Sequence, residues 1–302
     1  MIPLTRYDDI GEARPLIERC IRAYGWAAEH NTANFYHSQD PASRGTFFVS
    51  AEGWGVLAHL DEGAWYLFGE PVAPHNVRGA LLYAVCAQAL GDPAVQKVVL
   101  EVRSETRRAL LNELMPTTLR SRRIAETFCW PVLDLAGHDL SYAGPRFKDL
   151  RNARSRLLRD HQVRVAPARR IPSEALHDLV RRWERNRRAT HQSVSEAYHA
   201  LIDDRFSGTI QPRVLLLDGK PESLGAGWRI PHSNTYYLAV SLHSYAHKSV
   251  GEAAMMMDID WAKREGYDAM DLGGSDKKLL AFKKQFGKVS LYKTHQFSIV
   301  RR

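Results

Sequence analysis

Basic side chains that can bind phosphate are concentrated in one stretch of this 302-residue chain, from Arg146 to Arg188. The stretch holds fourteen Arg or Lys residues, thirteen of them arginine, against five acidic residues, which gives it a net charge of +9. The rest of the chain carries 28 basic and 29 acidic residues and is nearly neutral. Because each neutralised phosphate releases counterions, an extended arginine array favours a polyanion over a single phosphate.

Apolar residues at helical spacing predict that this basic stretch forms two amphipathic helices. The apolar positions are Phe147, Leu150, Ala153 and Leu157 in the first helix and Leu176, Leu179, Val180 and Trp183 in the second. Candidate phosphate-binding residues lie on the polar faces: Lys148, Arg151, Arg154 and Arg159 in the first helix, and Arg181, Arg185 and Arg188, at i, i+4 and i+7, in the second. The alternative interpretation is a solvated basic face without a ligand.

A short glycine motif, Lys248-Ser249-Val250-Gly251-Glu252-Ala253, lies between an expected strand and a long expected helix. Its K-x-x-G-x-A spacing resembles the loop with which GNAT acyltransferases hold the pyrophosphate of acyl-CoA on backbone N–H groups at a helix start. The alternative is an ordinary helix start with a small residue for close packing. The motif keeps an acyl-CoA donor open.

The elements that must position these residues form two series with the same order: helix, meander of strands, helix, strand, helix, strand. In the first half we expect helices over 12–23, 77–89 and 105–114 and strands over 46–51, 55–60, 64–68, 97–102 and near 131–135. After the two basic helices we expect strands over 213–217, 225–230, 235–240, 269–272 and 290–299 and helices over 251–265 and 279–285. Turn residues at 52–53, 61–63 and 218–220 separate the strands of the meanders.

The repeated order predicts an α/β protein, more fully α+β with mixed sheets, built from two similar halves. We place the domains at residues 1–140 and 141–302, with the basic helices at the start of the second. The halves share a pattern and no residue-level identity. Hydrophobic residues make up 44% of the chain and charged residues 25%, which is ordinary for a well-packed protein and excludes a disordered chain.

Cysteine usage and hydropathy predict a soluble, cytoplasmic protein. Cys20, Cys86 and Cys129 contain no C-x-x-C pair and are typical of free thiols in a reducing compartment. The first fifteen residues carry acids and a proline where a signal peptide needs an apolar run, and the longest strongly apolar stretch, residues 80–90, is shorter than the roughly 20 residues of a spanning helix. The histidines form no H-E-x-x-H motif or Cys/His cluster, so we expect no metal.

Three further motifs carry a resemblance to known families. Residues 53–74, with the turn Gly69-Glu70-Pro71-Val72, resemble the first half of the catalytic domain of lysylphosphatidylglycerol synthases. Residues 131–135 and 146–156, with a K-x-x-R-N-x-x-x-R core, resemble the bridge into the second half of that domain. Residues 271–276 and 282–287 are similar to the D-x-G-G and F-K-x-x-F-G signatures of Fem-type peptidyltransferases. The resemblance covers about residues 45–297.

This resemblance implies a tandem GNAT-like acyltransferase fold and transfer of an aminoacyl group from aminoacyl-tRNA to an amine or hydroxyl. It implies that Phe282 and Lys283, with Lys284 beside them, bind the acceptor end of the tRNA. Lys283 is expected to neutralise charge on the carbonyl oxygen or the terminal phosphate, unless it is only a surface lysine. Asn152, together with Lys148 and Arg151, matches the K-x-x-R-N core and is expected to contact phosphate or carbonyl groups.

Two acidic residues, Asp271 and Asp276, bracket a pair of glycines at the end of an expected strand, where backbone can approach a ligand closely. We expect one of them to bind the α-ammonium of the aminoacyl group or to accept a proton from the nucleophile. The alternative is that Asp271 caps the following turn or helix. With Lys283 they are the candidate catalytic residues, and we expect no cofactor beyond aminoacyl-tRNA as co-substrate, because its ester is already activated.

Two departures from these families bear on the acceptor. The sequence has no multi-helix membrane region like that of the synthases and no coiled-coil arm like that of many Fem-type enzymes. We therefore expect a small soluble acceptor, as in a specialised biosynthetic pathway, while contact with a membrane surface stays open. The alternatives are an acyl-CoA-dependent N-acyltransferase, a phosphatidylglycerol aminoacyltransferase acting at the membrane surface, and a non-catalytic nucleic-acid-binding protein.

Overall fold

The chain divides into two compact units, and its C-terminal residues return to the first of them. The computed structural model describes residues 2–37, 45–115, 117–187 and 195–302. Unit 1 comprises Met1–Trp130, Ile230–Ser233 and Tyr292–Arg302, and unit 2 comprises Pro131–Arg229 and Asn234–Leu291. The predicted division at residue 140 differs from these units in three respects: the chain enters unit 2 at residue 131, residues 230–233 belong to unit 1, and so do the last eleven residues. Strands β7 (Glu126–Asp134) and β13 (Val289–Arg301) each contribute to both units.

Unit 1 is built on a mixed sheet with a single parallel pair among its described strands. Its strand order is β1 (Thr5–Tyr7), β2 (Thr46–Ala51), β3 (Trp54–Asp61), β4 (Ala64–Leu67), β5 (Lys97–Arg103), β13 and β6 (Leu119–Ser121), and β4 pairs in parallel with β5. The two predicted hairpin turns are confirmed. Both place a glutamate and a glycine at positive φ, namely Glu52 and Gly53, then Glu62 and Gly63, as a twisted two-residue turn requires.

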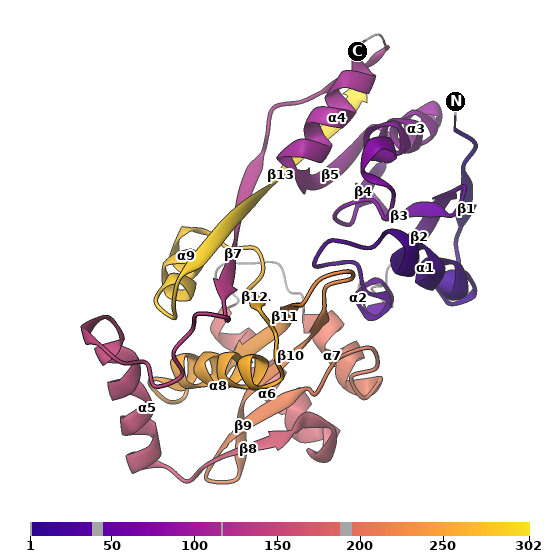
Figure 1. The fold of residues 1–302 in the computed structure, drawn as a ribbon. Coiled ribbons are helices and arrows are strands. Elements are labelled where there is room, and N and C mark those ends of the chain that lie inside the picture. The colour runs from indigo at the N-terminus through magenta and orange to yellow at the C-terminus, as the bar shows by residue number, and fades with distance from the viewer. Residues whose placement is uncertain (1, 38–44, 116, 188–194) are drawn as a thin grey trace. The chain divides into compact units, whose positions relative to one another are not determined.

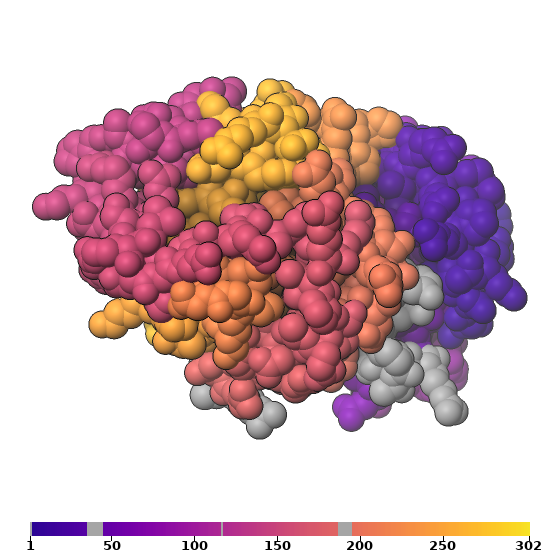
Figure 2. Space-filling view, turned by 90° about the horizontal axis from the view of Figure 1, so that it is seen from below, coloured from indigo at the N-terminus to yellow at the C-terminus, as the bar shows by residue number. Residues whose placement is uncertain are grey.

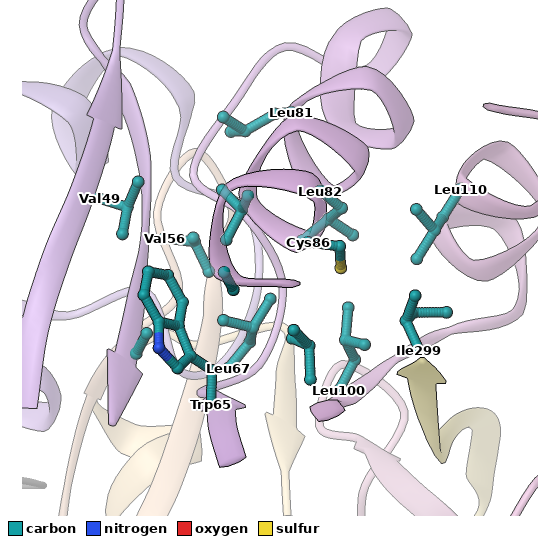
Figure 3. Close-up of a cluster of buried hydrophobic side chains, with 14 of the residues drawn as sticks. Val49, Val56, Trp65, Leu67, Leu81, Leu82, Cys86, Leu100, Leu110 and Ile299 are labelled. Atoms are coloured by element: carbon teal, nitrogen blue, oxygen red, sulfur yellow. The ribbon is translucent and has the colours of Figure 1, made fainter. Parts of the chain in front are cut away.

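Helices cover both faces of the unit 1 sheet. Alternate residues of a strand point to opposite faces, and both faces carry apolar side chains that the helices bury. Helix α1 (Ile10–Tyr24) packs on the face that carries Phe48 and Leu57. Helices α3 (Arg78–Gly91) and α4 (Ser104–Leu114) cover the opposite face, where Val49, Val56, Leu100 and Ile299 meet Leu82 and Leu110 (Figure 3). A further helix, α2 (Thr32–His37), follows α1.

Unit 2 repeats this plan, again with strands of mixed direction. Its strand order is the end of β7, then β12 (Ala269–Asp271), β11 (Thr235–His243), β10 (Lys220–Arg229), β9 (Arg213–Leu217) and β8 (Val163–Pro167). Here β11 and β12 form the parallel pair. The predicted Asp218-Gly219 turn joins β9 to β10 with both residues at positive φ. Strand β8 and helix α7 (Ser195–Asp203) were not predicted from the sequence.

Five α-helices in the part of unit 2 that the structure describes surround its strands (Figure 1). Helices α5 (Lys148–Asp160) and α8 (Val250–Arg264) pack against Leu215 and Leu217 of β9. Helices α6 (Ser173–Arg187) and α7 pack against Val214 and Leu216 on the opposite face. The fifth helix, α9 (Lys277–Lys284), follows β12. None of the helices in the described residues is long and apolar enough to cross a membrane.

The apolar stripes predicted for the two basic helices are largely confirmed. In α6 all four predicted residues are buried, and in α5 Leu150 and Leu157 are buried whereas Phe147 and Ala153 are half-buried. Figure 2 shows residues of α5 and α6, in pink to red, across one face of unit 2. The basic segment therefore anchors itself by its apolar stripes and leaves its polar side to solvent.

Candidate functional site

The parallel strands of unit 2 separate at their carboxyl ends, and this fork holds the candidate site. Strand β12 pairs with β11 over only three residues, of which the last pair is Tyr237 with Asp271. Beyond it, β11 continues to His243, while the chain after β12 turns away through Gly273, whose φ is +80°. One side of β11 thus loses its neighbour strand.

A cavity of about 240 Å³ lies in this fork. Strand β11, the turn after β12, and helices α6, α7, α8 and α9 all contribute to its wall. The polar and aromatic side chains in the lining are Trp183, Tyr198, Tyr237, Ser241, His243, Tyr245, Phe282 and Lys283. Every lining residue belongs to unit 2, so the cavity is a property of that unit alone. It combines one ammonium group with hydroxyl, imidazole and aromatic surfaces.

Lys283 supplies the ammonium group of this cavity. The residue is only 6% exposed, and its Nζ donates hydrogen bonds to the carbonyl oxygens of Leu272 and, at 3.1 Å, of Gly273. Burial lowers the pKa of Lys283 to about 8, against the opposing attraction of Asp271 and Asp276. The sequence alternative of a surface lysine is wrong, because the structure buries this side chain in the cavity wall.

The hydroxyl of Tyr237 converges on the same point. A Cβ atom placed on Gly273 would lie 3.8 Å from both Lys283 Nζ and Tyr237 Oη. The absence of a side chain at residue 273 therefore leaves these two groups facing one small space. Trp228, Tyr236 and Tyr237 alternate with smaller residues on expected strands, and this pattern predicts that all three belong to the core. Trp228 and Tyr236 are buried, whereas Tyr237 is half-buried and lines the cavity.

A readable signal for the β11 residues exists in the sequence. Tyr237, Ala239, Ser241 and His243 alternate with Leu238, Val240 and Leu242, which are buried. Alternation of this kind puts the first set on one face of the strand. All four odd-numbered residues line the cavity. The polar residues among them, on a strand whose other residues are buried, were therefore the sequence signal for this site.

The two candidate acids occupy different environments. Asp271 is 1% exposed, and its Oδ1 accepts a hydrogen bond from the Gly273 N–H at 2.9 Å. Asp276 is exposed and is the N-cap of α9, where its Oδ1 accepts a bond from the Leu279 N–H at 2.8 Å. Neither is a lining residue of the cavity. In this structure both stabilise the β12–α9 connection that holds Lys283, and their assigned catalytic roles stay predictions.

Phe282 and Lys284, the neighbours of Lys283, are separated by the helix. Phe282 lines the cavity and packs edge-on against Phe286. Lys284 is exposed, and its backbone carbonyl accepts a hydrogen bond from Arg146 at 3.0 Å. Of the F-K-K triplet, the structure therefore brings Phe282 and Lys283 to the cavity and leaves Lys284 on the surface.

The predicted phosphate-binding residues of α5 divide into exposed and anchored groups. Lys148, Asn152 and Arg159 are exposed, and Arg159 forms an ion pair with the neighbouring Asp160. Arg151 instead donates to the carbonyl oxygens of Tyr142 and Gly144, so it fixes the loop that leads into α5. The half-buried Arg154 lies 5.9 Å from the Tyr142 ring centre, nearer the α5–α8 contact.

On α6, Arg181 and Arg185 are exposed, and Arg181 forms a surface ion pair with Glu174 at 2.7 Å. Exposed pairs of this kind contribute little and separate readily. Arg182 is structural, because it binds the buried carboxylate of Glu222 at 3.0 Å. Arg188 lies outside the described residues.

The glycine motif at 248–253 starts α8 beside the cavity. Ser249 precedes the helix at φ 72°, and the helix begins at Val250. Gly251 lines the cavity, and a Cβ atom there would approach the His243 imidazole to 2.9 Å. The first-turn N–H groups of any helix lack intrahelical acceptors. The motif therefore combines the two features predicted from its spacing: close packing and free amides at a helix start.

The corresponding fork in unit 1 is occupied by a side chain. Strand β5 continues past the last residue of β4 to Arg103, and Glu70 follows β4 in the G-E-P-V turn. The Glu70 carboxylate accepts hydrogen bonds from the Arg103 N–H and the Thr106 hydroxyl, both at 2.6 Å. Burial raises its pKa to about 7. Glu70 thereby caps the start of α4 across the fork.

Metal chemistry receives no support from the described part of the chain. Among residues 2–37, 45–115, 117–187 and 195–302, no group of three or more His, Cys, Asp or Glu side chains is arranged to hold a metal ion. Cys20 and Cys86 are buried, Cys129 is half-buried, and none of the three forms a disulfide.

Comparisons with known proteins identify the fold. Residues 145–284 match the family model of the acetyltransferase (GNAT) domain. A search of curated protein sequences found no match. The C-terminal domain of a protein described as a lysylphosphatidylglycerol synthetase of Agrobacterium fabrum superposes with a TM-score of 0.66 at 16% identity, over 97% of this chain and 92% of that one.

Two further solved structures extend this result. FemX matches with a TM-score of 0.56 at 12% identity, over 98% of this chain and 97% of that one. A tandem GNAT protein from the clavulanic acid biosynthesis pathway matches with a TM-score of 0.54 at 11% identity, over 99% and 98%. The predicted mixed α/β, tandem GNAT fold and the resemblance to lysylphosphatidylglycerol synthases and Fem-type proteins are therefore confirmed at the level of fold.

Proposed function

We propose that this protein is an acyltransferase that moves an aminoacyl group from aminoacyl-tRNA to an amine or hydroxyl of a small soluble acceptor. The observation that carries the proposal is the buried Lys283 ammonium, which lines the fork cavity of unit 2 together with Tyr237; Lys283 Nζ and Tyr237 Oη are each 3.8 Å from the position that a Cβ atom on Gly273 would take. The GNAT domain match and the fold support the acyltransferase class, and the donor and acceptor are the proposed part.

The chemistry needs little more than positioning and charge stabilisation. The nitrogen or oxygen of the acceptor attacks the ester carbonyl, the bond from that carbon to the tRNA oxygen breaks, and the tRNA hydroxyl leaves with the acceptor's proton. Negative charge develops on the carbonyl oxygen in between. We assign Lys283 and Tyr237 to donate hydrogen bonds to that oxygen, because donors held in place before the reaction stabilise developing charge most strongly.

A polyanionic donor is supported by the surface of the same unit. Lys148, Asn152 and Arg159 on α5, and Arg181 and Arg185 on α6, present exposed donors outside the cavity. Each exposed guanidinium can form forked hydrogen bonds with phosphate oxygens. Many such contacts must act together to give useful affinity at physiological salt.

An acyl-CoA donor is the second candidate, and one observation favours it. Gly251 lies in the cavity wall at the start of α8, where free N–H groups can bind a pyrophosphate. The two donors make different predictions. Acyl-CoA would protect the amides of residues 248–253 from hydrogen exchange, whereas aminoacyl-tRNA would protect α5 and α6.

The test is a transfer assay with total tRNA charged in parallel with each of the twenty amino acids. Loss of ester-linked label is measured with a small-molecule extract of the source cells, with phosphatidylglycerol vesicles, and with neither. The variant is Lys283→Met, which keeps the aliphatic chain and removes the charge. The matched control is Lys278→Ala, an exposed lysine on the same helix. Thermal unfolding of each variant checks that it is folded.

We expect extract-dependent loss of label from one charged tRNA, retained by Lys278→Ala and reduced at least a hundredfold by Lys283→Met, the effect of removing an oxyanion donor. Transfer that occurs only with vesicles would move the acceptor to phosphatidylglycerol. No transfer from any charged tRNA, together with consumption of acetyl-CoA, would contradict the proposal in favour of the second candidate.

A further inference from the structure

A second polar cavity, of about 250 Å³, lies in unit 2 between the first turn of α6 and the turn that follows α7. Its lining contains three arginines, Arg169, Arg170 and Arg205, and no acidic residue. All lining residues belong to unit 2, and none lines the fork cavity. Three like charges around one hollow create a positive potential there, which attracts anions to any arginine that has no structural task.

Arg169 has a structural task. Its guanidinium donates to the carbonyl oxygens of Arg205, Phe206 and Thr209, at 3.2, 3.0 and 3.3 Å. Arg169 thus holds the turn after α7 in place. Arg170 and Arg205 are exposed and have no ion-pair partner in the described part of the chain. Their guanidinium donors are available to a ligand.

The backbone at Arg205 has a left-handed conformation that glycine adopts more easily than arginine. Helix α7 ends in a Schellman turn: the Phe206 N–H binds the Leu201 carbonyl at 2.8 Å and the Arg205 N–H binds the Ile202 carbonyl at 3.0 Å. The residue at this position adopts φ 49°, and glycine is preferred there because it has no Cβ. Arginine therefore carries some backbone strain at this position, as does the adjacent Phe206 at φ 59°, and glycine at residue 205 would remove it there.

We infer that this cavity, called here the arginine pocket, binds a phosphoryl group between Arg170 and Arg205. Two guanidinium forks match the tetrahedral oxygens of phosphate, and the Ser173 hydroxyl in the same lining adds a donor. The pocket lies at one end of α6, and Trp183, ten residues on, lines the fork cavity. A rise of about 1.5 Å per residue puts the start of α6 at the pocket roughly 15 Å from Trp183 at the fork cavity.

The source of the phosphoryl group rests on the proposed function. If aminoacyl-tRNA delivers its ester to the fork cavity, the exposed basic residues of unit 2 offer a path for its sugar-phosphate backbone along α6. The arginine pocket then takes one backbone phosphate and fixes the direction of the acceptor strand along α6. A free phosphorylated small molecule has the same recognition chemistry, and the experiment separates the two sources.

The experiment uses the full chain with the substitutions Arg205→Gly and Arg170→Gln, alone and together. Glycine relieves the strain at residue 205, so the thermal midpoint of Arg205→Gly is expected not to fall. Arg120→Gln, an exposed arginine of unit 1, controls for charge. The first measurement is thermal stabilisation by inorganic phosphate against chloride at equal ionic strength. The second is affinity for uncharged total tRNA as a function of KCl concentration.

We expect phosphate to stabilise the wild type and Arg120→Gln, and to lose this effect in the double variant. For tRNA, the slope of log affinity against log salt should fall by roughly 1 in the double variant, the amount for one lost phosphate contact. Equal phosphate stabilisation in all five proteins would overturn the inference.

A lost phosphate response with an unchanged salt slope would overturn tRNA as the source and leave a free phosphorylated compound. The transfer assay reports on the proposed function independently. If no charged tRNA is a donor, yet the double variant still loses the phosphate response, the proposed function fails and the arginine pocket stands.

Discussion

Lys283 Nζ lies 3.1 Å from the carbonyl oxygen of Gly273, so the ammonium group on α9 binds the backbone just after the end of β12, where the fork begins. The carbonyl oxygens of Leu272 and Gly273 replace part of the water that the buried charge has lost. Desolvation still dominates, because the pKa of Lys283 falls to about 8. The residue is therefore mainly protonated at neutral pH and titrates just above it.

A role as a cationic donor predicts how the rate depends on pH. Because the protonated form stabilises the oxyanion, kcat/KM should fall as pH rises through the pKa of Lys283, about 8. Lys283→Arg keeps its charge at all accessible pH values and should move this fall to higher pH, whatever its effect on the maximum rate. The measurement is kcat/KM from pH 6 to 10. A profile that rises through pH 8 would instead identify Lys283 as a general base.

The turn at Gly273 offers a separate test of the cavity. Alanine at φ +80° is strained, and its Cβ would contact Tyr237 and lie 3.8 Å from Lys283 Nζ. We expect Gly273→Ala to cost roughly 1 to 2 kcal/mol of unfolding free energy and to lower kcat at least tenfold. Gly219→Ala, at φ +83° in a hairpin with open space around its Cβ, is the matched control. Equal activity losses in the two variants would indicate a stability effect only.

Much of the fold could be predicted because its signals are local. Alternating strands, helical stripes and the Asp218-Gly219 turn fix each element within a short window. The division into units could not be predicted in the same way, because β7 and β13 serve both units and nothing in their sequences marks the change. Strand β8 was missed because its five residues lie between two strongly basic helices.

The candidate site could be predicted only where its signal was local. Lys283 was found through its motif, whereas Tyr237 and His243 were missed because a strand residue is core or cavity according to whether a neighbour strand covers it. That depends on where β12 ends, which is a tertiary property. Likewise, charge counting could not separate Arg159, which stays on the surface, from Arg151, which binds loop carbonyls.

The buried Glu70 predicts a pH dependence of stability that is independent of activity. Its pKa is about 7 in the folded protein and near 4.5 when exposed, so the folded state holds a proton that the unfolded state releases between these values. Unfolding free energy should therefore fall as pH rises through this window. Glu70→Gln removes the ionisable carboxyl group and with it this pH dependence. The variant should be more stable than the wild type at pH 8, by roughly 1 to 3 kcal/mol, and similar to it at pH 5.

Denaturant unfolding of the wild type, Glu70→Gln and the exposed control Glu113→Gln at the two pH values makes this measurement. Because the amide can still accept the Arg103 N–H, the cap on α4 is retained in the variant. A Glu70→Gln protein that is less stable than the wild type at both pH values would show that the ionised carboxylate is required there.

A histidine pair joins α6 to α7 and predicts the opposite pH dependence. His177 Nδ1 lies 2.7 Å from His199 Nδ1, and His177 Nε2 lies 2.9 Å from Asp203 Oδ1. Since the carboxylate only accepts, His177 Nε2 carries a proton, and the contact between the two Nδ1 atoms has room for one proton. Burial, with help from His177 and Arg181, lowers the pKa of His199.

Below about pH 6.5 His199 therefore takes up a proton more readily in the unfolded chain than in the folded protein, and the free energy of unfolding should fall as pH drops through that value. Replacing His199 by Gln removes this term, so the stability difference between wild type and His199→Gln should shrink from pH 7.5 to pH 5.5. Denaturant unfolding at these pH values measures it. A difference that stays constant would mean that the two rings share no proton and meet only by packing.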